Sequence, residues 1–218
     1  MRFFMKHIYI ISGFGADERV FSKLDFGNND VHFIQWKIPA PHETIATYAY
    51  KMSREIVHPN PVLIGLSFGG MMAIEIAKLI PVEKVILISS IRNRYELPFF
   101  MKLTAWLHLN KIIPLRPFRI LEPIENYNLG VETEEEKKLL REYRKNIDQR
   151  YTDFAINEIV NWKNEWSPEN VIHIHGTNDH IFPIKYIKDP DYVIPGGGHL
   201  LLMNNADEVN NILKKVLQ

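Results

Sequence analysis

The chain has 218 residues, of which 46% are hydrophobic, and its 26 basic side chains balance 26 acidic ones. This length predicts one domain with room for an insertion, and the balanced charge offers no basic face for nucleic acid. The absence of cysteine excludes disulfides, cysteine-ligated zinc and a thiol nucleophile. Because no run of 18 apolar residues occurs, we expect no membrane span and a cytoplasmic protein.

Short apolar strands alternate with helical segments along the first 90 residues, which predicts a parallel α/β sheet. The expected strands are His7–Ser12, Val31–Trp36, Pro61–Ile64 and Lys84–Ser89. The expected helices are Asp17–Leu24, Glu43–Val57 and Gly70–Ile80. In the second of these helices, Ile45, Tyr48, Ala49, Met52 and Ile56 recur at helical spacing.

Gly65-Leu66-Ser67-Phe68-Gly69 has the pattern G-x-S-x-G and joins a predicted strand to a predicted helix. A serine on such a sharp turn exposes its oxygen at the carboxyl end of the sheet. Side chains at Gly65 and Gly69 would collide where strand, turn and helix crowd together. An ordinary Gly/Ser turn is the alternative, but the strand-turn-helix context favours a nucleophilic Ser67.

No strand pattern occurs from about Ile91 to Trp166, so we predict an all-helical insertion over residues 91–166. Its expected helices are Phe99–Leu109, which is apolar nearly all round, Glu132–Ile147, with a capping box at Thr133–Glu136, and Thr152–Trp166. Residues 1–90 and 167–218 then form the α/β core. Trp106, Trp162 and Met71 are candidates for a substrate pocket, although such aromatic and methionine side chains also serve as core packing.

The α/β pattern returns with the strands Val171–Gly176 and Tyr192–Ile194, a short segment at Pro183–Ile187, and a final helix at Ala206–Leu217. A nucleophilic serine needs a base and a carboxylate that orients the base. Asp179 follows the first of these strands, and His199 follows the second after three glycines that let the loop fold back. We therefore predict that Asp179 and His199 meet Ser67.

Four segments together resemble the α/β-hydrolase superfamily, and the resemblance covers nearly the whole chain. They are Ser12-Gly13-Phe14-Gly15, Gly65–Gly70, His175–Asp179 and Gly197-Gly198-His199. The resemblance implies a compact, mostly parallel sheet of about six strands rather than eight, flanked by helices, with a helical cap. It also implies a Ser67/Asp179/His199 triad and an oxyanion hole of the Phe14 and Phe68 backbone N–H groups.

The chain departs from this pattern in two places. Ser12-Gly13 stands where many relatives have His-Gly, which changes one hydrogen-bonding group beside the oxyanion loop. The His-Gly-Gly-Gly motif of one lipase and esterase branch is absent, which disfavours that branch.

The expected function is hydrolysis of a small, fairly apolar ester or thioester, with no cofactor and no metal. The run His173-x-His175-x-x-x-Asp179-His180 is two residues too long for the zinc motif of metallo-β-lactamase-like hydrolases, and Gly196–Gly198 lacks the helix and lysine of a phosphate loop. Carbon–carbon hydrolysis, acyl transfer, lyase chemistry and a ligand-binding module without turnover stay open. Arg92 and Arg94 would favour an anionic substrate if they lined the pocket. The sequence leaves the oligomeric state open.

Overall fold

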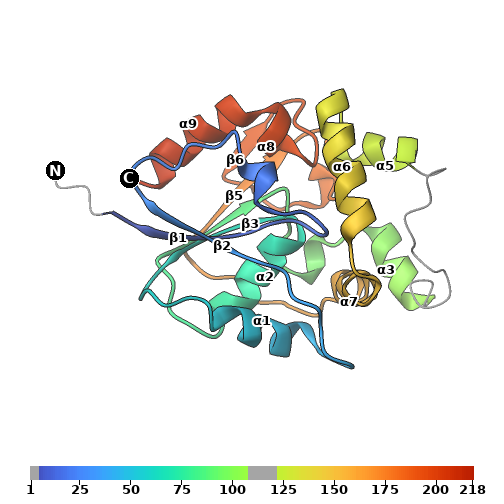
Figure 1. Ribbon diagram of the computed structural model, residues 1–218, viewed down its shortest axis with the longest axis horizontal. Coiled ribbons are helices and arrows are strands. Elements are labelled where there is room, and N and C mark those ends of the chain that lie inside the picture. The colour runs from blue at the N-terminus through green and yellow to red at the C-terminus, as the bar shows by residue number, and fades with distance from the viewer. Residues whose placement is uncertain (1–4, 108–121) are drawn as a thin grey trace.

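Six parallel strands form one sheet in the computed structural model, which describes residues 5–107 and 122–218 (Figure 1). The strands are β1 (His7–Ile11), β2 (Asp30–Ile34), β3 (Val62–Leu66), β4 (Lys84–Ile88), β5 (Val171–Gly176) and β6 (Tyr192–Ile194). Their order across the sheet is β2-β1-β3-β4-β5-β6, and every neighbouring pair is parallel. This confirms the predicted α/β fold.

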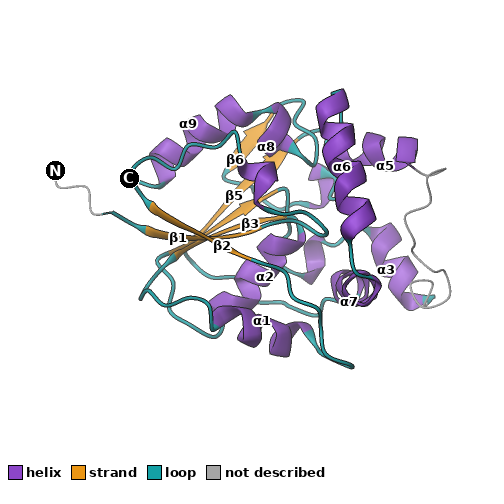
Figure 2. Cartoon of the chain, viewed as in Figure 1, coloured by secondary structure: helices purple, strands orange, loops and turns teal. Residues whose placement is uncertain are grey.

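Successive residues of each central strand point to opposite faces, so the sheet separates two hydrophobic cores. Tyr9 and Ile11 enter the core under α1 (Ile45–Ser53) and α2 (Phe68–Ala77). Ile8 and Ile10 enter the core under the short α8 (Leu201–Asn204) and α9 (Ala206–Val216). Figure 2 shows these two helical layers on opposite sides of the strands. Burial on both faces explains why the central strands are continuous apolar runs.

Two helices of the first half are shorter than the sequence predicts. The segment Asp17–Leu24 contains one 3-10 turn, η1 (Glu18–Phe21), in which only Val20 and Phe21 are buried. In place of Glu43–Val57, α1 begins after Thr44, whose hydroxyl accepts a hydrogen bond from the Thr47 N–H. A cap of this kind sets the start of a helix, so the preceding residues stay outside it.

Between β4 and β5 the described residues form α3 (Phe99–Trp106), α5 (Glu122–Leu129), α6 (Glu134–Asn146) and α7 (Gln149–Val160). These helices lie together beyond one end of the sheet (Figure 1). The capping box is confirmed, since the Thr133 hydroxyl and the Glu136 carboxylate each accept the other residue's backbone N–H. The helix predicted at Thr152–Trp166 ends at Val160 instead, and residues 108–109 of the predicted Phe99–Leu109 helix lie outside the described residues.

Among the described helices, none has both the length and the apolar character needed to cross a bilayer.

Candidate active site

Ser67 sits on a strained turn between β3 and α2. Its φ of 53° and ψ of −120° lie in a region that residues other than glycine seldom occupy, at a cost of roughly 1–3 kcal/mol. A Cβ on Gly65 would lie 2.4 Å from the Gly69 carbonyl oxygen, and one on Gly69 would lie 2.3 Å from the Ile11 carbonyl oxygen. Both positions therefore need glycine for the turn to close against β1.

Gly69→Ala is expected to lower the free energy of unfolding by about 3 kcal/mol or more, because its methyl group would meet backbone oxygens that have no room to move. Urea unfolding measures the change. Gly13→Ala is the matched control, since its methyl group would meet its nearest neighbour, the Ser67 Cβ, at an ordinary 3.5 Å. Equal stability of the two variants would contradict this account of the turn.

The three residues predicted as a triad lie in hydrogen-bond contact. His199 Nε2 is 2.9 Å from Ser67 Oγ, and His199 Nδ1 is 2.8 Å from Asp179 Oδ2. They come from the loops that follow β3, β5 and β6, which the parallel sheet brings to the same edge. With Nδ1–H donating to the carboxylate, the Nε2 lone pair faces the serine hydroxyl and can accept its proton.

Asp179 is held as a buried carboxylate that is ready to orient the imidazole. Its Oδ1 accepts the backbone N–H groups of Ile181 and Phe182, each at 2.8 Å. Burial alone would raise the pKa of Asp179, but the charge and hydrogen bond of His199, the charge of His175 and the Phe182 N–H together bring it below its ordinary value. The carboxylate is therefore ionised at neutral pH.

The glycine-rich loop before His199 is pinned against the end of β5. A Cβ on Gly176 would lie 2.1 Å from the Gly197 carbonyl oxygen, and the Asn178 N–H donates to that same oxygen at 2.9 Å. This contact between the two loops fixes the position of the backbone that carries His199. The glycines thus bring the base and its carboxylate together.

The loop after β1 lies against the serine as the oxyanion prediction requires. A Cβ on Gly13 would lie 3.5 Å from the Ser67 Cβ, and the Ala16 N–H donates to the Gly13 carbonyl to close a turn. Ser12 stabilises this turn, since its hydroxyl donates to the Ala16 carbonyl and accepts from the Trp36 indole at 3.0 Å. The use of the Phe14 N–H as an oxyanion donor stays a prediction.

The second predicted donor is the Phe68 N–H. Phe68 is the first residue of α2, and the first amides of a helix have no carbonyl partner within it. Its position next to Ser67 places this N–H beside the nucleophile, and its use as an oxyanion donor also stays a prediction.

The inserted helices touch the loops around the serine. The Tyr151 ring of α7 stacks on Phe14 at 5.8 Å, and Gly130, just after α5, approaches Gly198 so closely that a Cβ there would lie 3.1 Å from its Cα. The Tyr151 hydroxyl is buried near the Gly15 backbone of the same loop. Tyr151 belongs to no motif, so sequence reasoning missed it.

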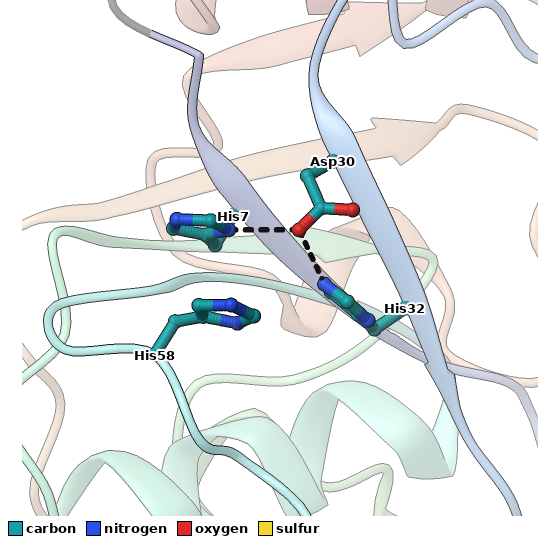
Figure 3. Close-up of side chains that lie close together, drawn as sticks. All are labelled: His7, Asp30, His32 and His58. Atoms are coloured by element: carbon teal, nitrogen blue, oxygen red, sulfur yellow. Dashed lines mark hydrogen bonds and ion pairs between the residues drawn. The ribbon is translucent and has the colours of Figure 1, made fainter.

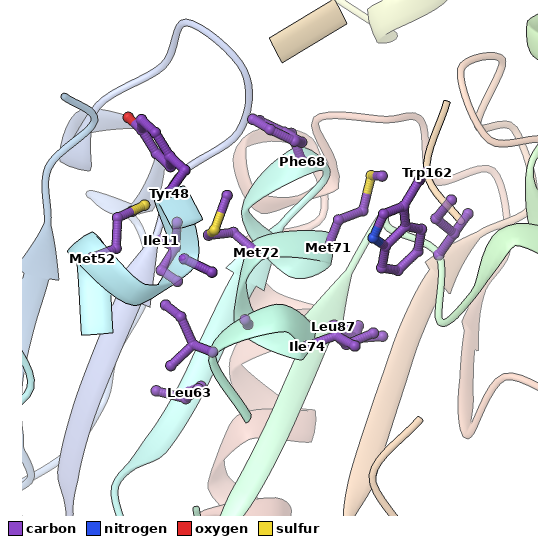
Figure 4. Close-up of a cluster of buried hydrophobic side chains, with 14 of the residues drawn as sticks. Ile11, Tyr48, Met52, Leu63, Phe68, Met71, Met72, Ile74, Leu87 and Trp162 are labelled. Atoms are coloured by element: carbon purple, nitrogen blue, oxygen red, sulfur yellow. The ribbon is translucent and has the colours of Figure 1, made fainter. Parts of the chain in front are cut away.

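The three residues predicted for a substrate pocket differ in their exposure. Met71 and Trp162 are buried in the core over α2, where the Trp162 indole donates to Glu75 at 2.8 Å (Figure 4). Trp106 is 75% exposed on α3. A role of these three residues in binding substrate stays a prediction.

The two arginines that could have signalled an anionic substrate are already paired. Arg92 lies 2.8 Å from Asp191, and Arg94 lies 3.4 Å from Glu165. Each guanidinium therefore has its charge compensated by a carboxylate.

Two buried histidines of β5 contact backbone carbonyl groups of loops near the triad. His175 Nε2 lies 2.7 Å from the Phe182 carbonyl, and His173 Nε2 lies 3.0 Å from that of Ser90. The Ser90 hydroxyl donates in turn to the Ser67 carbonyl at 2.6 Å. These two rings therefore help to fix the backbone near the triad. His180, in the loop after β5, is more exposed than either of them.

Falling pH is expected to destabilise the protein through these two histidines. Burial lowers the pKa of both His173 and His175 below the ordinary value of 6.5. Below about pH 6.5 the unfolded chain therefore binds protons that the folded chain does not, so stability falls by up to about 1.4 kcal/mol per pH unit for each group.

Urea unfolding between pH 8 and pH 5 measures this slope. His173→Gln should flatten it, whereas His42→Asn, at an exposed position with a φ of 60° that asparagine tolerates, should not. A stability that stays level over this range in the unaltered protein would refute the assignment.

The sequence model described as "Alpha/beta hydrolase family" matches residues 11–212. No curated protein sequence matches the chain. A thermophilic esterase from Thermogutta terrifontis is similar at 17% identity and a TM-score of 0.69, covering 98% of this chain and 91% of that one.

Two further solved structures are similar over nearly the whole chain. A putative lipase from Acinetobacter baumannii has 14% identity and a TM-score of 0.72, with 97% of this chain and 84% of that one covered. A bromoperoxidase from Bacillus anthracis has 16% identity and a TM-score of 0.68, with 98% and 92% covered. At these identities the structures establish the fold, and the sequence model establishes that this chain belongs to the alpha/beta hydrolase family.

Proposed function

We propose that this protein is a serine hydrolase that cleaves small, fairly apolar carboxylic esters or thioesters through an acyl-enzyme on Ser67. The observation that carries the proposal is the hydrogen-bonded chain from Asp179 through His199 to a serine on a strained turn. A serine without a role in catalysis has no need of that conformation, of a neighbouring base, or of a buried carboxylate behind the base.

In the proposed reaction, Ser67 Oγ attacks the carbonyl carbon and its proton passes to His199 Nε2. Asp179 stabilises the imidazolium that forms. The N–H groups of Phe14 and Phe68 stabilise the oxyanion, each by about 2.7–4 kcal/mol. His199 then gives its proton to the departing alcohol or thiol, and water hydrolyses the acyl-enzyme with the same base.

Aromatic side chains around the serine loops favour an apolar acyl group. The Trp36 ring stacks on Phe68 at 5.1 Å and lies 5.4 Å from the Tyr151 ring, which in turn stacks on Phe14. We propose that the helical insertion over residues 91–166 acts as a cap, since α5 and α7 touch the loops of His199 and Phe14. The similarity to a thermophilic esterase and a putative lipase supports ester cleavage.

Intact-mass analysis after fluorophosphonate treatment, together with turnover of p-nitrophenyl acetate, butyrate and octanoate, tests the proposal. We expect one label per chain and faster turnover of the shorter esters. A folded protein that neither labels nor turns over any of these esters would overturn the esterase assignment. It would then favour another reaction of the fold or a ligand-binding role.

A further inference from the structure

Three histidines and one aspartate converge at the end of the sheet opposite Ser67 (Figure 3). His7 begins β1, Asp30 and His32 lie on the edge strand β2, and His58 lies in the loop between α1 and β3. One potential ligand atom from each residue lies within 4.8 Å of all the others. All four side chains are half-buried, so an ion from solvent can reach them.

The strand register explains how residues far apart in sequence meet. His7 is the Cα partner of Asp30, and Tyr9 is the partner of His32. Residues two apart on a strand share a face, so the side chains of Asp30 and His32 stand beside that of His7. The loop before β3 then brings His58 over the same face, with its ring stacked on His7 at 3.6 Å.

The cluster combines three imidazoles with one carboxylate. Asp30 Oδ2 lies 2.9 Å from His7 Nδ1 and 2.7 Å from His32 Nε2. Imidazoles around a carboxylate are a typical ligand set for Zn²⁺.

We propose that His7, Asp30, His32 and His58 bind one divalent transition-metal ion, with Zn²⁺ as the best match. Tetrahedral bonds of about 2.0–2.2 Å place ligand atoms roughly 3.4 Å apart, so the four atoms, now within 4.8 Å, close in by roughly 1.4 Å at most. Binding turns the His58 ring out of its stack on His7, because the lone pair of a ligating nitrogen lies in the ring plane.

A buried tyrosine orients the fourth ligand. The Tyr9 hydroxyl lies 2.8 Å from His58 Nδ1 and accepts the Val57 N–H at 3.2 Å. When His58 Nδ1–H donates to Tyr9, the Nε2 lone pair is left for the metal, as in other histidine-ligated sites. Tyr9 is 2% exposed and is therefore fixed by its packing.

Four protein ligands leave no open position, which indicates a structural ion rather than a catalytic one. Such an ion would join the edge strand β2 to β1 and to the loop before β3. The site lies at the amino ends of these strands, whereas Ser67 follows the carboxyl end of β3. Removal of the ion should therefore change stability more than ester turnover.

Zinc titration of the EDTA-treated full chain, in competition with a chromophoric chelator, tests the proposal. We expect one Zn²⁺ per chain, and an intense visible absorption typical of tetrahedral coordination when Co²⁺ replaces it. His32→Gln and His58→Gln should abolish this binding, and His42→Asn, the matched control, should retain it. Tyr9→Phe should weaken the affinity about 10- to 100-fold. Zn²⁺ should raise the melting temperature of the unaltered protein and of the control, but not that of His32→Gln or His58→Gln.

Failure of the unaltered chain to bind Zn²⁺, or a weak Co²⁺ absorption typical of octahedral coordination, would overturn the proposal. So would binding that survives in folded His32→Gln and His58→Gln variants. The Co²⁺ spectrum uses the unaltered protein, so the proposal stays testable even if a variant fails to fold.

Discussion

Ser67→Ala is expected to lower kcat/KM for p-nitrophenyl butyrate about ten-thousand-fold or more and to abolish fluorophosphonate labelling. The variant keeps the proposed oxyanion donors and the apolar walls but removes the hydroxyl oxygen that lies 2.9 Å from His199 Nε2. Removing one member of a triad leaves the modest rate that binding and oxyanion stabilisation supply. The backbone strain at this residue persists with alanine, so the fold should change little.

The control for this substitution is Ser167→Ala, which removes a hydroxyl just before β5, at the other end of the sheet. Both variants should show the far-ultraviolet circular dichroism of the unaltered protein, and the control should label and turn over ester normally. Retained labelling or turnover in Ser67→Ala would place the nucleophile elsewhere and refute the proposed mechanism.

The positions of the strands and the meeting of Ser67, Asp179 and His199 could be predicted because each depends on local patterns. Buried parallel strands are continuous apolar runs, and their carboxyl ends share one edge of the sheet. A residue just after one strand is therefore close to a residue just after its neighbour, whatever lies between them in sequence. The separation of 112 positions between Ser67 and Asp179 places no limit on that contact.

The surroundings of the serine could not be predicted in the same way. Helical periodicity predicts an apolar face for Trp162 but not which neighbour that face meets, and Tyr151 precedes the expected helix Thr152–Trp166. Tyr151 packs on the Phe14 loop, whereas Trp162 packs on the core of α2. Sequence reasoning also missed the cluster around Asp30 and predicted that the protein binds no metal. The four residues of that cluster come from three separate segments and form no motif.

Asp179→Asn is expected to lower kcat about ten-thousand-fold while leaving the structure intact. The backbone N–H groups of Ile181 and Phe182 require an acceptor, so the amide oxygen of the asparagine replaces Oδ1. Its NH₂ group must then face His199 Nδ1. An imidazole that accepts at Nδ1 carries its proton on Nε2, and it can no longer take the proton of Ser67.

Steady-state kinetics of Asp179→Asn, compared with Asp189→Asn, measure this effect. Asp189 is an exposed residue with a φ of 43°, a conformation that asparagine adopts readily, so the control tests the same chemical change outside the site. The thermal unfolding of Asp179→Asn should stay cooperative, because both backbone N–H groups keep their acceptor. A variant with more than a tenth of the normal kcat would show that the carboxylate does not set the tautomer of His199, and the role assigned to Asp179 would be wrong.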